Sequence, residues 1–312
     1  MVKKFDQAQD SATSQERLAK LARDDDPYVR RGVASNINTS LEVLTELSRD
    51  DDPYVRRGVA ENLFAPADLL VELGQDENPY VRREVAKHPH SAIATLMRLA
   101  IDHETNVRYS VAENANPAIA DILDQLSYDS DKNIRWRVAR NPNTAPSTLD
   151  RLVNDAYEIT RHSVASNIHT SRDTLHRLAN DANETILKFV AGNTNTSADD
   201  LAMLAKHNNF LIRAQVASNP STQAIVLSEL TKDDYSQVRL GVANHINTQV
   251  CDLGQLVHDK DWMVRMAVAQ NPHATIALLT LLSVDEDEDV VKTAQETLAT
   301  RSRSTFAWGM GG

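Results

Sequence analysis

The twelve residues RDDDPYVRRGVA at positions 23–34 recur without change at positions 49–60. The same frame continues down the chain as a Val-Ala pair, which recurs every 26 residues except for one step of 27. The pairs begin at Val33, Val59, Val85, Val111, Val138, Val164, Val190, Val216, Val242 and Val268. A period of this length indicates a repeat protein, in which each unit buries its apolar face against its neighbours.

Each repeat contains two helical patterns. Leucines three residues apart, such as Leu44 and Leu47, share one helix face, and valines four residues apart, such as Val29 and Val33, share another. Helices of about nine residues are unstable alone in water, so they must stack to bury these columns. The pattern predicts an all-α fold, an α-α superhelix (solenoid) of about eleven two-helix repeats.

The helix ends also carry signals. We expect Thr39, with Glu42 three residues later, to cap the first helix of its repeat, and Asp52 to cap the second, with Pro53 in its first position. The second helix ends near an asparagine such as Asn62, a residue type that tolerates the left-handed conformation that stops a helix. The extra residue of the 27-residue step is expected to lengthen the turn at Asn116-Pro117 and to disturb the stacking there.

We expect a lead segment at 1–14, one solenoid over 15–300 and a flexible tail at 301–312. The last repeat departs from the Val-Ala rule at Ala294-Gln295, and about 286–300 is interpreted as a polar capping helix. The tail (RSRSTFAWGMGG) is glycine-rich and carries Phe306 and Trp308, which could form a short docking peptide.

The copy at 134–152 (IRWRVARNPNTAPSTLDRL) shows the full repeat string. This string resembles the leucine-rich repeat variant family, a shortened relative of HEAT and armadillo repeats, over roughly residues 15–300. The resemblance implies a curved superhelix and no particular activity. An iron–sulfur member of that family has an additional cysteine-rich segment, which this sequence lacks, so we expect no such cofactor.

Composition narrows the functional classes. The formal net charge is −11, whereas a domain that wraps nucleic acid is usually basic. A single cysteine, Cys251, excludes an internal disulfide framework and fits a reducing compartment. The sequence has no run of 18 apolar residues and no apolar stretch after the first lysines. We therefore expect a cytoplasmic protein, and a monomer, without a membrane span.

Columns of aspartate and arginine run through the repeats, six residues apart, as in Asp24 and Arg30. They could form a polyelectrolyte-binding stripe, but we favour structural ladders, because the arginine fork can bond two carboxylates. The aspartate triplets lack the central glycine and distant glutamate of a calcium loop. The sequence has no Gly-rich phosphate loop and no Gly-x-Ser-x-Gly motif, so we expect no metal, no cofactor and no catalysis.

The remaining informative residues face away from the core columns of the second helices. They change along the chain from tyrosine with arginine, through an aromatic segment of tyrosine, tryptophan and histidine, to leucine and methionine. The candidate binding residues are Tyr28, Arg31, Tyr54, Arg57, Tyr80, Arg83, Tyr109, Trp136, His162, Leu211, Leu240, Met263 and Met266. Tyrosine, tryptophan and arginine are enriched at protein-binding hot spots, although such side chains can also lie over neighbouring repeats as packing groups.

The leading functional prediction is a non-catalytic scaffold that binds a protein or peptide on the concave face of the superhelix, which the family resemblance assigns to the second helices. The alternative is a nucleic-acid-binding or DNA-repair protein of HEAT-like fold. In that case Arg31, Arg57 and Arg83 would contact phosphates, and Tyr109 or Trp136 would stack on a base.

Overall fold

The computed structural model describes the backbone of residues 2–309 and the side chains of residues 4–301. These residues form 23 α-helices and one 3-10 helix, and no β-strand occurs within this range. The chain divides into two compact units, Met1–Ser163 and Val164–Gly312, which are described separately. The prediction of an all-α solenoid of two-helix repeats is confirmed. The domain bounds at 15–300 stay a prediction.

Each complete repeat pairs a seven-residue first helix with a second helix that is nine residues long in all but the last repeat. The first helices are α2 (Gln15–Leu21), α4 (Leu41–Leu47), α6 (Ala67–Leu73), α8 (Ile93–Leu99), α10 (Ala120–Leu126), α12 (Pro146–Leu152), α14 (Arg172–Leu178), α16 (Ala198–Leu204), α18 (Ala224–Leu230), α20 (Val250–Leu256) and α22 (Ile276–Leu282). The second helices are α3 (Pro27–Ser35), α5 (Pro53–Glu61), α7 (Pro79–Lys87), α9 (Thr105–Glu113), α11 (Lys132–Arg140), α13 (Glu158–Ser166), α15 (Glu184–Gly192), α17 (Phe210–Ser218), α19 (Ser236–Asn244), α21 (Trp262–Gln270) and α23 (Glu288–Gly309).

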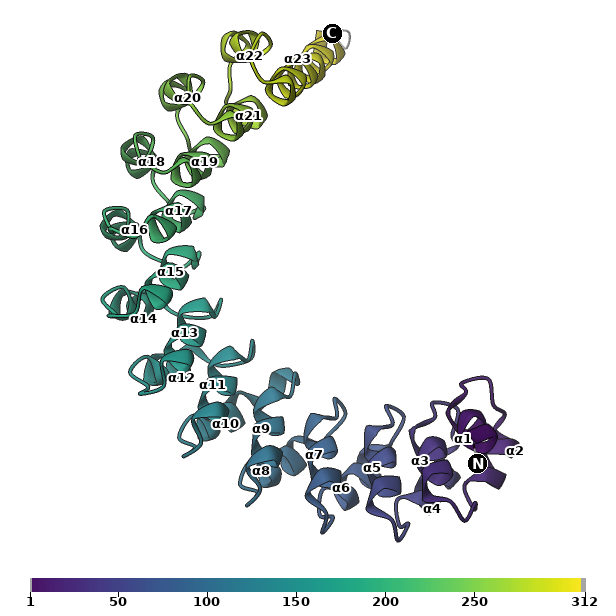
Figure 1. The fold of residues 1–312 in the computed structure, drawn as a ribbon. Coiled ribbons are helices and arrows are strands. Elements are labelled where there is room, and N and C mark those ends of the chain that lie inside the picture. The colour runs from purple at the N-terminus through teal and green to yellow at the C-terminus, as the bar shows by residue number, and fades with distance from the viewer. Residues whose placement is uncertain (1, 310–312) are drawn as a thin grey trace. The chain divides into compact units, whose positions relative to one another are not determined.

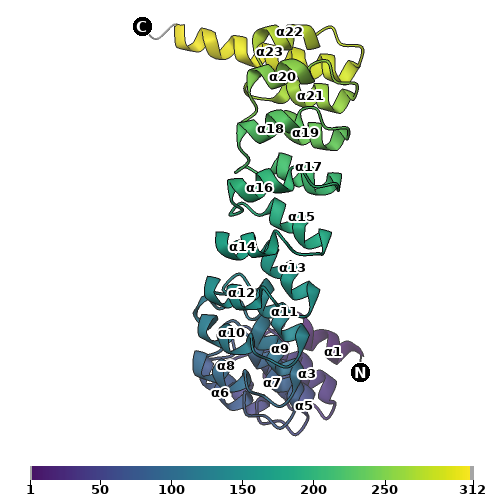
Figure 2. The ribbon, with the colours of Figure 1, turned by 90° about the vertical axis from the view of Figure 1, so that its left-hand side faces the viewer.

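Within each unit the helices form two layers, one of first helices and one of second helices (Figure 1). Within each unit, second helices such as α3 and α5 or α17 and α19 pack directly on one another, whereas a first helix such as α4 contacts the second helices on either side of it. In Figure 2 the two layers of the unit that begins at Val164 lie side by side. The leucine and valine columns fill the space between the layers, and Leu44, Leu47, Val29 and Val33 are at most 1% exposed.

Small residues allow the second helices to approach closely. A Cβ atom added to Gly58 would lie 2.9 Å from the Cβ atom of Ala34 on the preceding second helix. In the other unit, a Cβ atom on Gly241 would lie 2.8 Å from that of Ala217. Glycine is therefore needed at these two positions for contact between helices, and not for a special backbone angle.

The asparagine column ends the second helices in a way that differs from the prediction. None of the non-glycine residues in the described part of the chain has a positive φ, and Asn62 has an extended backbone with φ −75° and ψ 117°. Its side-chain amide donates hydrogen bonds to the carbonyl oxygens of Ala34, at 2.8 Å, and Asn36, at 2.9 Å, in the preceding repeat. The left-handed expectation was wrong because a neighbouring repeat supplies the polar partner that the sequence alone does not show.

The threonine column has a different role from the predicted cap. Ser40, and not Thr39, is the N-cap of α4, and its hydroxyl accepts a hydrogen bond from the amide of Val43. Thr39 is buried, and its hydroxyl donates to the carbonyl oxygen of Val33 at 2.6 Å. The same carbonyl oxygen accepts a hydrogen bond from the Asn36 amide at 3.0 Å, so Thr39 adds a second bond at the end of α3.

The extra residue of the long repeat lies where it was predicted. It forms part of an additional 3-10 helix, η1 (Pro117–Ile119), which Asn116 caps and which buries Ile119 before α10 begins. The asparagine ladder continues across the insertion, because Asn141 still donates to the carbonyl oxygens of Ala112 and Asn114, both at 2.9 Å.

Both ends of the chain extend further into helices than the sequence suggested. The lead segment contains α1 (Val2–Gln9), which packs on α3 in the place of a preceding second helix. Asn36 donates to the carbonyl oxygens of Ala8 and Asp10 as Asn62 does one repeat later. At the other end, α23 continues through the segment predicted as a tail to Gly309, and its last turns extend beyond the stacked helices in Figure 2. Phe306 and Trp308 lie outside the described side chains, and the tail's flexibility stays a prediction.

Candidate protein-binding surface

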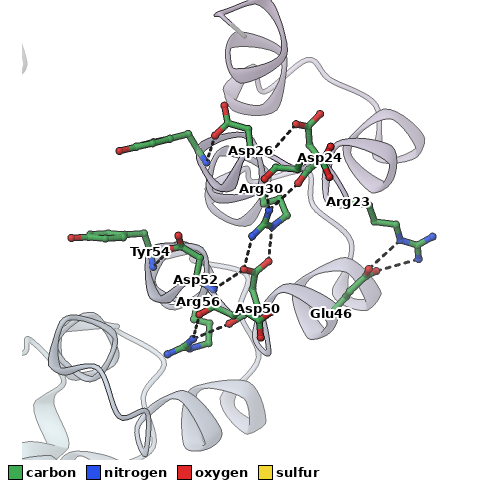
Figure 3. Close-up of polar contacts among 12 residues, drawn as sticks. Arg23, Asp24, Asp26, Arg30, Glu46, Asp50, Asp52, Tyr54 and Arg56 are labelled. Carbon is green, nitrogen blue, oxygen red and sulfur yellow. Dashed lines mark hydrogen bonds and ion pairs between the residues drawn. The ribbon is translucent and has the colours of Figure 1, made fainter.

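A ladder of ion pairs runs along the starts of the second helices, in which each arginine pairs with an aspartate of the next repeat. This ladder fixes the position of the neighbouring tyrosines. Arg30 donates to both carboxylate oxygens of Asp50 in the next repeat, at 2.7 and 2.9 Å, and to the backbone oxygen of Asp24 in its own turn, at 2.9 Å. Figure 3 shows Arg30 beside Asp50. Arg56 repeats this geometry with Asp76 and with the backbone oxygen of Asp50.

The ladder is therefore structural, as the sequence indicated. The same carboxylate pairing links Arg82 with Asp102, Arg108 with Asp129, Arg135 with Asp155, Arg213 with Asp233, Arg239 with Asp259 and Arg265 with Asp285. Burial acts to raise the pKa of Asp50, but hydrogen bonds from Arg30 and the Asp52 amide outweigh it and hold that pKa below its ordinary value.

Three tyrosines project from the start of the second helices in the first unit. Tyr28, Tyr54 and Tyr80 are 68%, 54% and 51% exposed. Their backbone amides donate to the caps Asp26, Asp52 and Asn78, whereas their side chains make no hydrogen bond or ring contact with a described residue. Figure 3 shows Tyr54 extending away from the ladder. We name Tyr28, Tyr54 and Tyr80 the tyrosine row.

Two of the three arginines beside the tyrosine row face glutamates of the fold. Arg57 lies 2.8 Å from a carboxylate oxygen of Glu61 on its own helix and 3.1 Å from one of Glu84 on the next. Arg31 lies 3.8 Å from Glu61. Arg83 is half-buried and makes no ion pair among residues 4–301. The Glu61 contact could have been anticipated, because Glu61 follows Arg57 by four residues on a helix.

The aromatic residues farther along the first unit contact other residues of the fold. Arg137 donates to the Tyr109 hydroxyl, at 3.0 Å from its Nε, and its guanidinium lies 4.9 Å from the centre of the Tyr109 ring and 5.0 Å from that of Trp136. Arg137 also pairs with Glu113 at 3.1 Å. Tyr109, Trp136 and His162 are half-buried, and burial lowers the pKa of His162 below its ordinary value.

In the second unit the predicted apolar residues divide into two kinds. Leu211 and Met263, at the helix starts, are 44% and 42% exposed. Leu240 and Met266, one turn farther along, are half-buried. The exposed pair thus occupies the same repeat position as the tyrosine row, within its own unit.

Three aromatic residues of the second unit were missed by the sequence analysis. Phe210 and Tyr235 stack with ring centres 4.3 Å apart and planes 5° apart, and Trp262 is 39% exposed. A pocket of about 540 Å³ lies beside them, lined by Asp234, Tyr235, Ser236, Gln237, Lys260, Asp261, Trp262 and Met263. The sequence does mark these residues, because they stand at the repeat positions that Asp52 and Pro53 occupy in an earlier repeat.

No group of three or more histidine, cysteine, aspartate or glutamate side chains among the described residues is placed to hold a metal ion. None of the helices in this part of the chain has the length and apolar character needed to cross a membrane.

The fold resembles that of known helical-repeat proteins. No protein-family model and no curated protein matches the sequence. Among solved structures, a leucine-rich repeat variant is 22% identical over 78% of this chain and 84% of its own, with a TM-score of 0.45. Kap121p bound to RanGTP is 10% identical over 95% of this chain, which spans only 46% of Kap121p, with a TM-score of 0.49.

Proposed function

We propose that this chain is a non-catalytic scaffold that binds a protein or peptide through the exposed starts of its second helices. The tyrosine row is the observation that carries the proposal. Three large amphipathic side chains recur in phase on successive repeats, are more than half exposed, and make no hydrogen bond or ring contact with a described residue. Isolated exposed apolar residues are ordinary, but a contiguous set of them marks an interaction surface.

The geometry favours a protein over a nucleic acid as the partner. Phosphate binding needs arginines that can exchange water or counterions for phosphate oxygens. Arg57 instead faces two glutamates, and Arg31 faces one of them. Tyr109 and Trp136, the expected base-stacking residues, already contact Arg137. These contacts reduce the positive charge and the ring surface that the alternative requires.

The proposal is tested by crosslinking the chain to its partners in extract of the source cell. We compare the wild-type chain, a variant with Tyr28, Tyr54 and Tyr80 replaced by serine, and a control with Met97 and Tyr128 of the first-helix side replaced by serine. Met97 and Tyr128 are 54% and 69% exposed, so the control removes similar surface from another face. We expect the tyrosine variant alone to lose its partner while its melting temperature stays near that of the wild type.

Equal capture by all three proteins would remove the tyrosine row from the binding surface and overturn the proposal. Capture of nucleic acid in place of protein, with loss on Arg57→Ala, would support the alternative function.

A further inference from the structure

The surface around Tyr28 and Tyr54 carries acidic side chains that make no ion pair among the described residues. The first aspartate of each turn is paired with a basic side chain. Lys4 forms an ion pair with Asp24, and Arg30 forms one with Asp50. The second acid of each turn, at Asp25, Asp51 or Glu77, is exposed. The carboxylates of Asp25 and Asp51 make no ion pair among the described residues, and that of Glu77 is 91% exposed and lies 3.7 Å from Arg56.

The capping acids add to this charge. Asp26 and Asp52 each accept a backbone hydrogen bond from the tyrosine two residues later, at 3.0 and 2.7 Å, and no basic side chain is paired with either. Each of the first two tyrosines therefore follows two acidic residues in the sequence, and the pocket beside Tyr28 is lined by both Asp25 and Asp26. Arg31 and Arg57 do not offset these charges, since Glu61 and Glu84 neutralise them.

An aromatic face beside free carboxylates is suited to a cation. The ring attracts an ammonium or guanidinium group through its quadrupole, and the carboxylates add an ion pair. A pocket of about 530 Å³ beside Tyr28 has this composition, with Asp24, Asp25, Asp26, Lys4 and Val29 as its other lining residues. The Lys4 ammonium group in this pocket already forms an ion pair with the Asp24 carboxylate, with 2.7 Å between nitrogen and oxygen. The pocket at Tyr235 and Trp262, described above for the second unit, lies at the same position of the repeat and also combines aromatic rings with aspartates.

From this geometry we infer that the tyrosine row binds a basic, extended segment of the partner protein, with one lysine or arginine side chain beside Tyr28 and another beside Tyr54. The inference rests on the proposed function and names the chemistry of the partner. Stacked helices lie about 8–10 Å apart. An extended polyproline-type chain advances about 3.1 Å per residue, so three residues cover about 9 Å. The segment therefore presents a basic residue at every third position.

The test uses fluorescence anisotropy with the full chain and three labelled peptides at low ionic strength. The first peptide has three lysines spaced three residues apart by serines, the second has the same composition with adjacent lysines, and the third has glutamate in place of each lysine. We expect the first to bind most tightly, the second more weakly, and the third not at all. Added salt should weaken the binding, because the attraction is between exposed charges.

Variants distinguish the tyrosine and carboxylate contributions. Tyr54→Leu should weaken binding of the spaced peptide about tenfold, whereas Tyr54→Phe, which keeps the ring face, should retain it. Asp51→Asn should weaken binding about threefold and reduce its salt dependence. Tyr128→Leu, on the first-helix side, is the matched control and should have no effect. Circular dichroism of each variant confirms the fold.

Equal binding of the three peptides, or unchanged binding in Tyr54→Leu, would overturn the inference. If the tyrosine row captures a partner from extract but the spaced peptide does not bind, the partner chemistry is wrong and the proposed function stands. If the triple serine variant keeps its partner, the proposed function itself fails.

Discussion

Replacing Asn62 with alanine tests whether the asparagine ladder holds the repeats together. Asn62 is 2% exposed. Its amide donates two hydrogen bonds to the preceding repeat, and its side-chain oxygen accepts one from the amide of Phe64 at 2.9 Å. Alanine would remove all three bonds and leave two buried carbonyl oxygens and one amide without these partners.

The magnitude follows from these three bonds. A typical hydrogen bond contributes about 1 kcal/mol net, and a buried polar group without a partner costs about 1–3 kcal/mol. Because water can enter the turn once the side chain is gone, we expect Asn62→Ala to lower the free energy of unfolding by about 3–5 kcal/mol. Asn62→His should cost less, since His88 occupies the equivalent position and bonds the carbonyl oxygen of Asn62 at 3.0 Å.

Urea denaturation followed by circular dichroism measures the loss, and hydrogen exchange locates it. In a repeat array, local damage should expose the amides of adjacent repeats before distant ones. Asn133→Ala is the control, because Asn133 is exposed and its side chain makes no hydrogen bond with a described residue. If Asn62→Ala costs no more than Asn133→Ala, the ladder does not stabilise the stack.

Two further changes probe the core and the pH dependence. Leu99 and Leu178 are 1% and 2% exposed. Replacing either with alanine should lower the free energy of unfolding, measured by urea titration, by about 2–5 kcal/mol. A loss below about 0.5 kcal/mol would mean that the leucine columns do not form the core. Burial lowers the pKa of His88 below its ordinary 6.5, so the folded state binds fewer protons than the unfolded chain as the pH falls below that value. Stability should therefore decline from about pH 6.5 downward, by at most about 1.4 kcal/mol per pH unit, and His88→Asn should flatten this part of the profile. An unchanged profile in His88→Asn would contradict this reasoning.

The helices could be predicted from sequence because their cause is local and periodic. Leu44 and Leu47 share a helix face because of their spacing alone, whichever residues pack against that face. Asp52-Pro53 marks a helix start through its own backbone geometry. The end of the helix at Asn62 was located correctly but explained wrongly. Its amide bonds carbonyl groups 26 and 28 residues earlier, and that distance along the chain becomes a contact only after stacking.

The lead segment was underestimated for a related reason. Residues 2–9 carry few of the repeat's apolar residues, so periodicity does not mark them as a helix of the array. Their backbone nevertheless offers the carbonyl groups of Ala8 and Asp10 to Asn36, and Ala8 is fully buried. The single helix α1 therefore packs on α3 at the position that a preceding second helix takes in later repeats.

Some residues of the candidate surface have side-chain partners within the fold, and others have none among the described residues. Arg57 and Tyr109 looked equally free in the sequence, yet their partners Glu84 and Arg137 stand on the next second helix, where only stacking brings them close. Tyr54 stands at the same exposed edge without a side-chain partner. Exposure alone does not imply binding, since proteins expose many apolar atoms. The case for binding rests on three such side chains in phase, because neither the core nor the ladder needs them. The turn acids Asp25 and Asp51, which make no ion pair among the described residues, add to it in the first two repeats.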